Sequence, residues 1–168
     1  MKKTIQSILV WMIFFEAGIS QSSTVYRYSN PDFFKGESVV FTENYHPHIK
    51  LPLNTILFTP DSNELIKAEH ILASQYNIYM KKIGLKEEKN VVKKFYGYKR
   101  QYLGFIDRNG TKRIIIKLLN FKRCKKPEEN YPNWESEYLV GFGEYYEKNT
   151  RAYVVNLMSA SLSYNYSD

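Results

Sequence analysis

The sequence predicts an α+β domain in which one long helix packs on an antiparallel sheet of four or five strands. Three patterns support this fold class: apolar residues at helical spacing over 59–84, alternation around an Asn-Gly turn over 100–121, and a second alternating pair over 138–158. One amphipathic helix laid across such a sheet buries the apolar faces of both with few elements.

The helix is the most clearly marked element. Thr59 is expected as its N-cap, because a threonine hydroxyl accepts a hydrogen bond from a free amide of the first turn, and Pro60 suits the first helical position. Gly84 is expected to end the helix in the left-handed conformation that often follows one. The apolar stripe that would face the sheet comprises Leu65, Ala68, Leu72, Tyr76, Tyr79 and Ile83, widened by Ile71 and Ile78.

Residues 100–121, RQYLGFIDRNGTKRIIIKLLNF, predict a β-hairpin. The turn is expected at residues 107–110, where Asn-Gly favours the positive φ angles of tight hairpins. Both faces of both strands are partly apolar, which predicts central strands. Residues 85–94 are interpreted as a charged linker or a frayed helical turn, and residues 122–133 as a basic loop. The second hairpin is expected over 138–158, with its turn at 147–150 and with residues 162–166 able to end the sheet.

The first 22 residues predict a signal peptide. Two lysines precede an unbroken apolar run over residues 8–15, and Gly18 and Ser20 supply small residues at positions −3 and −1 of a cleavage site before Gln21. An uncleaved membrane anchor is the alternative, but a bilayer span needs about 20 apolar residues, and Glu16 ends this run much earlier. The mature chain is therefore expected to be exported, periplasmic or extracellular, and not membrane-spanning.

The remaining chain divides into two parts. Residues 23–58 predict an irregular N-terminal segment with short strands at 39–41 and 55–58, and residues 59–168 hold the helix and the sheet. Cys124 is the only cysteine, so no internal disulfide can form. Its basic neighbours would favour the thiolate, but an incidental loop cysteine is the favoured interpretation.

Basic and aromatic residues are interleaved in two stretches, KKFYGYKRQY at 93–102 and FKRCKK at 121–126. Removing the leader takes away two lysines and one glutamate and leaves a net charge of +6. The interleaving is typical of single-stranded nucleic-acid binders, but export makes nucleic acid an unsuitable partner. The partners expected instead are an anionic envelope surface, such as lipid headgroups or acidic glycans, or another protein. The alternative is that these charges only keep an aromatic-rich sheet soluble.

No pattern singles out a catalytic, cofactor-binding or metal-binding residue. His46 and His48 can share one side of an extended chain, but a metal site needs further ligands, and the only other histidine is His70 on the predicted helix. The sequence contains no Gly-x-Ser-x-Gly elbow and no phosphate-binding glycine loop. No enzyme class or cofactor is therefore indicated. The carboxylates expected to be solvated charges are Glu43, Glu64, Glu69, Asp107 and Glu144.

Two resemblances accompany these patterns. The layout resembles the cystatin-like fold, which implies protease inhibition through a Gln-x-Val-x-Gly hairpin. Residues 101–105, Gln-Tyr-Leu-Gly-Phe, begin similarly, although the glycine comes one residue early and leucine replaces valine. The strings RQYLGFIDRNG and KLLNF, Trp134, and VNL at 155–157 also resemble small exported proteins of unknown role from Bacteroidetes-type bacteria, over about the last 110 residues. This second resemblance implies no activity.

The sequence thus favours an exported, non-enzymatic binding or structural domain of the cell envelope or exterior. Two alternatives stay open. One is a cystatin-like protease inhibitor, and the other is a small-ligand carrier or enzyme that uses a pocket between helix and sheet.

Overall fold

The computed structural model describes residues 24–30, 34–122, 125–141 and 143–164. The predicted signal peptide and Cys124 lie outside these ranges. In chain order the elements are β1 (Val25–Asn30), β2 (Phe34–Phe41), β3 (Ile56–Phe58), α1 (Ser62–Lys82), α2 (Val91–Phe95), β4 (Lys99–Ile106), β5 (Lys112–Leu119), α3 (Pro127–Asn130), α4 (Glu144–Asn149), β6 (Thr150–Asn156) and β7 (Ser161–Ser163).

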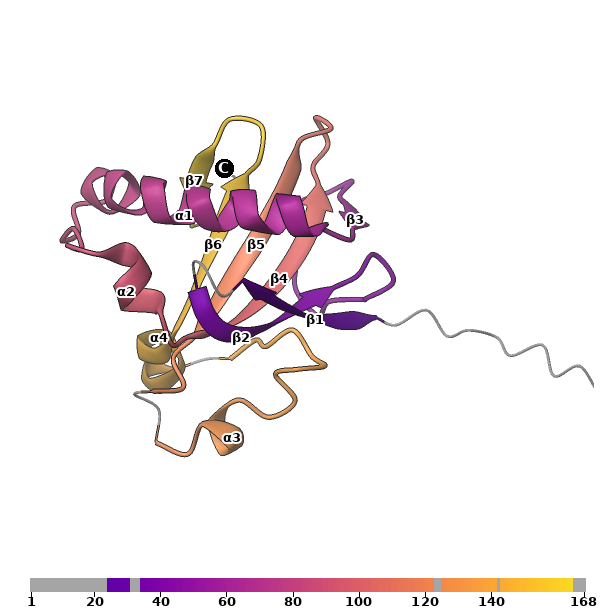
Figure 1. The fold of residues 1–168 in the computed structure, drawn as a ribbon. Helices are drawn as coiled ribbons and strands as arrows, with labels where there is room; N and C mark the ends of the chain where they lie inside the picture. Colours follow the sequence, from indigo (N-terminus) through magenta and orange to yellow (C-terminus); the bar gives the residue numbers. More distant parts are fainter. Residues whose placement is uncertain (1–23, 31–33, 123–124, 142, 165–168) are drawn as a thin grey trace, which may run out of the picture.

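The strands form one mixed sheet, with α1 lying across it (Figure 1). Among the described residues the sheet has seven strands: six follow the order β1-β2-β4-β5-β6-β7, and the seventh, β3, pairs with β4. β2 runs parallel to β4 along residues 38–41, whereas β3 runs antiparallel to the end of β4. The α+β class is confirmed, but the expected antiparallel sheet of four or five strands is wrong. The strands predicted at 39–41 and 55–58 are found as the end of β2 and as β3. β1 and residues 34–38 of β2 were not predicted, and they pair with each other as neighbours in the chain.

The face of the sheet under α1 contains the expected core. Leu65 and Leu72 of α1 are fully buried in one cluster with Ile114 of β5 and Val155 of β6, and Tyr79 packs against that cluster. This packing confirms the predicted contact between the amphipathic helix and the sheet. The interface is filled by side chains rather than open.

The stripe continues less far along α1 than expected. Ile78 and Ile83 are 63% and 45% exposed, although both were expected to face the sheet. A helix of 21 residues is about 31 Å long, and its C-terminal end projects beyond the strands (Figure 1). In this last part of the helix Tyr79 still packs against Tyr153 of β6, whereas Ile83, directly after the last turn, is exposed.

The start of α1 also differs from the prediction. The N-cap is Asp61 rather than Thr59, and its carboxylate accepts a hydrogen bond from the amide of Glu64 at 2.9 Å. The Glu64 carboxylate in turn accepts from the Asp61 amide at 3.1 Å, which completes a capping box. The Thr59 hydroxyl instead accepts from the amide of Glu43, so it ties the preceding loop to the helix start.

The end of α1 follows the prediction closely. Gly84 has a φ of 70° and lies directly after the C-cap. Its amide donates to the carbonyl of Lys81 at 3.1 Å, and the amide of Leu85 donates to the carbonyl of Met80 at 2.8 Å. This pair of bonds is a Schellman motif, which reverses the chain at the overhanging end of α1.

The predicted central hairpin is confirmed as β4 and β5, which are buried on both faces. Only Gly110 of its turn has a positive φ, and the Asp107 amide bonds the Thr111 carbonyl. The turn therefore lies where it was predicted, at residues 107–110, but Asn109 does not adopt the positive φ that Asn-Gly favours in tight hairpins. The Asp107 carboxylate accepts from the amide of Asn109 and from the Arg113 guanidinium, both at 2.9 Å, so it organises the turn.

The second predicted hairpin does not form. Residues 138–141 are not a strand, and α4 occupies the place of the expected arm and turn. The amide of Tyr138 donates to the Tyr45 hydroxyl, and that of Leu139 donates to the side chain of Gln101. These bonds hold the segment flat against the second face of the sheet, where its apolar residues join the cluster around Trp134. The tail contributes β7, which pairs with β6.

Candidate functional site

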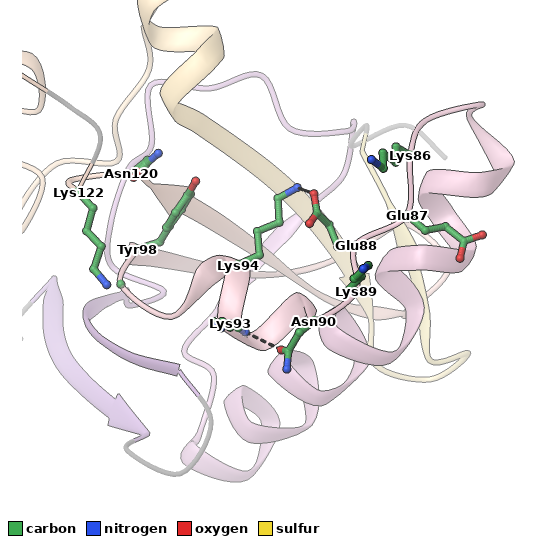
Figure 2. A pocket seen from close by; sticks show the side chains of 11 residues that line it. Lys86, Glu87, Glu88, Lys89, Asn90, Lys93, Lys94, Tyr98, Asn120 and Lys122 are labelled. Carbon is green, nitrogen blue, oxygen red and sulfur yellow. Dashed lines mark hydrogen bonds and ion pairs between the residues drawn. The ribbon is translucent and has the colours of Figure 1, made fainter.

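A lysine-lined hollow of about 660 Å³ lies beside α2, next to the overhanging end of α1 (Figure 2). Three separate parts of the chain form it: the linker between α1 and α2, the segment from α2 to the start of β4, and the residues after β5. We refer to it as the lysine hollow. Its lining residues are Lys86, Glu87, Glu88, Lys89, Asn90, Lys93, Lys94, Gly97, Tyr98, Asn120 and Lys122.

Two asparagines fix the linker that forms one wall. The Asn77 side chain on α1 donates to the carbonyl of Glu88 and accepts from the amide of Glu88, each at 2.8 Å. The Asn90 side chain caps α2 by accepting from the amide of Lys93 at 2.8 Å. The linker is therefore held at both ends, and its lysines project from a defined backbone.

Lys94 has a structural role within the hollow. Its ammonium forms an ion pair with the Glu88 carboxylate and lies 5.3 Å from the centre of the Tyr76 ring, as expected for a cation–π contact. Burial acts to lower the pKa of Lys94, but the bonds to Glu88 and Tyr76 outweigh it and raise that pKa overall. Lys94 therefore stays charged, and Glu88 neutralises it.

The opposite wall depends on Gly97. The Lys122 side chain runs directly over this glycine, and a Cβ placed there would lie 2.1 Å from the Lys122 Cε. The Lys122 ammonium also lies 5.5 Å from the centre of the Tyr96 ring. The bare backbone thus leaves room for Lys122 to reach the hollow, with Tyr98 and Asn120 beside it (Figure 2).

The hollow carries a surplus of positive charge. Five lysines and two glutamates line it, and the ion pair between Lys94 and Glu88 cancels one charge of each sign. Within the described ranges, no acidic side chain forms an ion pair with Lys86, Lys89, Lys93 or Lys122. Each lysine offers three N–H donors and no acceptor, so this arrangement suits an anionic group.

The hollow brings together the two basic and aromatic stretches singled out in the sequence. Residues 93, 94, 97 and 98 come from the first stretch and Lys122 from the second. Sequence reasoning missed Lys86 and Lys89, which belong to the segment interpreted as a plain charged linker. The signal in the sequence was the run Lys-Glu-Glu-Lys-Asn, which carries both lysines. Its last residue, asparagine, is the N-cap of α2 and so fixes the end of this run.

The other residues considered in the sequence do not assemble. His46, His48 and His70 are all exposed. Within the part of the chain that the structure describes, no three side chains of the metal-binding types gather into a group. Cys124 lies outside that part.

One of the carboxylates expected in solvent is instead fully buried. Glu69 of α1 and Arg100 of β4 are both 0% exposed and lie 3.5 Å apart. The Tyr102 hydroxyl donates to Glu69 and accepts from Arg100, and the Asn30 amide also donates to Glu69. Burial raises the pKa of Glu69, and the hydrogen bond from Tyr102, the positive charge of Arg100 and the hydrogen bond from the Asn30 side chain counteract that rise. The guanidinium also donates to the carbonyl of Phe34 at 2.8 Å. These internal contacts tie β1, β2 and β4 to the helix, which gives the cluster a structural role.

Lys117 of β5 is a second buried cation, on the opposite face of the sheet. It is 7% exposed and donates to the carbonyl of Leu139. Its ammonium lies 4.8 Å from the centre of the Tyr138 ring and 5.2 Å from that of Tyr146. Burial lowers the pKa of Lys117 to about 8. It contacts a carbonyl and aromatic faces and lines none of the hollows described for this protein.

Comparisons of the chain with protein-family models, curated proteins and solved structures gave no significant match. No helix within the described residues combines the length and the apolar character needed to cross a membrane. The lysine hollow is thus the feature with the clearest binding chemistry.

Proposed function

We propose that this protein is an exported, non-enzymatic binding domain that captures an anionic partner of the cell envelope or exterior in its lysine hollow. The observation that carries the proposal is the convergence of four lysines without ion-pair partners among the described residues on one hollow of about 660 Å³. A volume of this size is ordinary for a ligand site. The two fixing asparagines, Asn77 and Asn90, support it further, because they hold the lysines in place before any ligand arrives.

The chemistry of the lining favours binding over catalysis. The lining contains lysines, two glutamates, two asparagines, one tyrosine and one glycine. One of the glutamates, Glu88, already pairs with Lys94. The remaining lysines dominate the chemistry of the lining, and an ammonium group donates hydrogen bonds to an anion.

The alternative of a cystatin-like inhibitor receives little support from the environment of its motif. The segment from Gln101 to Phe105 is fully buried in the central strand β4. An inhibitory hairpin must be exposed to enter a protease cleft. If the chain nevertheless inhibits papain-like proteases at stoichiometric dose, this reasoning is wrong.

The alternative of a pocket between helix and sheet is also weakly supported. The interface of α1 with β4, β5 and β6 is occupied by side chains with almost no exposure. The lysine hollow lies beside α2, and its lining residues in Figure 2 are mostly charged or polar and do not belong to that interface. A carrier of small apolar ligands would need space within the interface itself.

A pair of matched double variants tests the proposal. Heparin serves as a soluble polyanion, and its affinity for the purified protein is measured by calorimetry at several salt concentrations. Lys86→Gln with Lys89→Gln should weaken binding about two- to fivefold per lysine, since an exposed charge contact contributes up to about 1 kcal/mol. Binding by the parent chain should fall as salt rises.

The control removes the same charge elsewhere. Lys50→Gln with Lys67→Gln changes two exposed lysines outside the hollow, so heparin affinity should change little. Equal weakening by both double variants would mean that net charge, rather than the hollow, attracts the polyanion. Absence of any heparin binding by the parent chain would contradict the proposed function directly.

A further inference from the structure

The overhanging end of α1 exposes apolar side chains next to the lysine hollow. Ile78, Ile83 and Leu85 are 63%, 45% and 55% exposed. Single exposed apolar residues are common on protein surfaces, but several large ones gathered on one short segment indicate an interaction site. From residue 78 to residue 83 the helix rises about 8 Å but turns about 140°, so Ile78 lies on another side of α1, and the apolar side chains at the end itself are Ile83 and Leu85.

Lysines surround these apolar side chains. Residues 81–94 contain six lysines and two glutamates, and Lys81, Lys82, Lys86 and Lys89 are all exposed. The same chain segment therefore presents aliphatic groups and ammonium groups together. This combination is typical of surfaces that lie in the interface of an anionic bilayer, where aliphatic groups enter the acyl boundary and lysines reach the headgroup phosphates.

The backbone at this end is fixed. The Schellman motif at Gly84 turns the chain so that Leu85 lies beyond the last turn of α1. Three residues later, the Asn77 side chain clamps the backbone of Glu88. Leu85 and Lys86 thus lie between two fixed points, and little ordering is needed when they meet a surface.

We propose that this end of the molecule, residues 81–89 with the adjoining lysine hollow, docks on an anionic lipid bilayer. The inference rests on the proposed function and names its partner: phospholipid headgroups occupy the hollow while Ile83 and Leu85 enter the interface. Soluble polyanions and proteins offer charge for the lysines but no acyl layer for the exposed aliphatic side chains. The charge and apolar complementarity together select the bilayer.

A tryptophan placed at the proposed insertion point reports contact with lipid. Leu85→Trp is compared with Leu53→Trp, a position that is 85% exposed in the loop before β3, near the other end of α1 (Figure 1). Vesicles of phosphatidylglycerol with brominated phosphatidylcholine quench a tryptophan that enters the acyl boundary. Quenching is expected at position 85 and not at position 53, over the background of the parent chain, which carries Trp11 and the buried Trp134.

Sedimentation with the same vesicles separates the two contributions. Ile83→Gln with Leu85→Gln should weaken vesicle binding about tenfold or more, because each side chain loses further burial of apolar surface. Heparin binding should stay unchanged in this variant. Lys86→Gln with Lys89→Gln should weaken vesicle binding about fivefold per lysine, and vesicles of phosphatidylcholine alone should not bind the parent chain.

The outcomes distinguish this inference from the proposed function. One outcome is that heparin binding depends on Lys86 and Lys89 while position 85 is not quenched and the Ile83/Leu85 variant sediments like the parent. In that case the bilayer inference is wrong and the anion-binding function stands. If neither heparin nor vesicles respond to Lys86 and Lys89, the proposed function fails as well. Equal quenching at positions 53 and 85 would also overturn the inference, because it would indicate non-specific adsorption.

Discussion

Lys117 provides the sharpest quantitative test of the fold. Its ammonium is buried against a carbonyl and two aromatic rings, and burial lowers its pKa from the ordinary value of 10.5 to about 8. In the unfolded chain the group returns to its ordinary value. Between these two pKa values the unfolded state binds more protons than the folded state, so stability must rise as pH rises through this window.

The magnitude follows from the two pKa values. The deficit that Lys117 imposes on the free energy of unfolding is about 3 kcal/mol at neutral pH, and about 2 kcal/mol of it is recovered between pH 8 and pH 10. A Lys117→Met variant keeps the length of the side chain without the charge. The difference in stability between parent and variant should therefore shift by about 2 kcal/mol in favour of the parent over this range. The tyrosines that titrate at higher pH are present in both proteins and cancel.

Urea unfolding followed by far-ultraviolet circular dichroism, at half-unit steps between pH 7 and pH 10, measures this shift. Lys67→Met is the control, because Lys67 is exposed on α1 and forms no ion pair within the described ranges. Its stability profile should run parallel to that of the parent. Parallel profiles for the parent and Lys117→Met would refute the reasoning, since they would mean that the carbonyl and the rings hold the ammonium as well as water does.

Three further predictions concern the other buried contacts. Glu69→Leu should destabilise the fold by about 3–5 kcal/mol in urea unfolding, because it leaves Arg100 charged and buried. Adding Arg100→Met should restore much of that loss, and a double variant as unstable as the single one would contradict this. Gly36→Ala should lower the melting temperature by several degrees, since the new Cβ would lie 2.1 Å from a backbone carbonyl oxygen. Gly97→Ala should barely change the melting temperature, because the new Cβ there meets only the flexible end of a lysine side chain. Gly97→Ala should still weaken heparin binding by displacing that lysine. Gln101→Leu should expose the segment at 134–139 to limited proteolysis, because it removes three hydrogen bonds to that segment's backbone, and an unchanged cleavage pattern would show that apolar packing alone holds the segment.

The elements that sequence reasoning predicted correctly are those that local rules decide. The periodicity of α1, the glycine that ends it and the turn between β4 and β5 each depend on neighbouring residues. The N-cap of α1 was misplaced by two residues because threonine and aspartate are both good caps. Asp61 is the N-cap because Glu64 lies three residues further on and completes the capping box.

Two regions were missed or only partly predicted. The strand predicted at 39–41 is the end of β2, where it pairs in parallel with β4, whereas β1 and residues 34–38 of β2 were not predicted. Residues 138–141 have a strand-like pattern, but their amides bond to side chains of Tyr45 and Gln101, so they lie on the face of the sheet rather than in it. A pattern of period two does not distinguish these two arrangements.

The burial of Glu69 had a visible signal that was not used. Glu69 lies four residues after Leu65 and seven before Tyr76, on the same side of α1 as the apolar stripe. A charge at such a position needs a buried partner. That partner, Arg100, lies on a strand 31 positions later, and only the packing of α1 across β4 brings the two together.

Because both faces of the sheet are covered, the surfaces left for binding lie at its ends. One face lies under α1 and the other under the loops that carry Tyr45 and Trp134. Of the lysines in the hollow, Lys94 packs on core rings, whereas Lys86, Lys89 and Lys93 are exposed and belong to neither core cluster. Yet two asparagine side chains fix the backbone that carries them, and immobilising such a linker costs conformational entropy. This linker is ordered at a cost in conformational entropy although its lysines do not pack in the core, so we expect it to have a binding role.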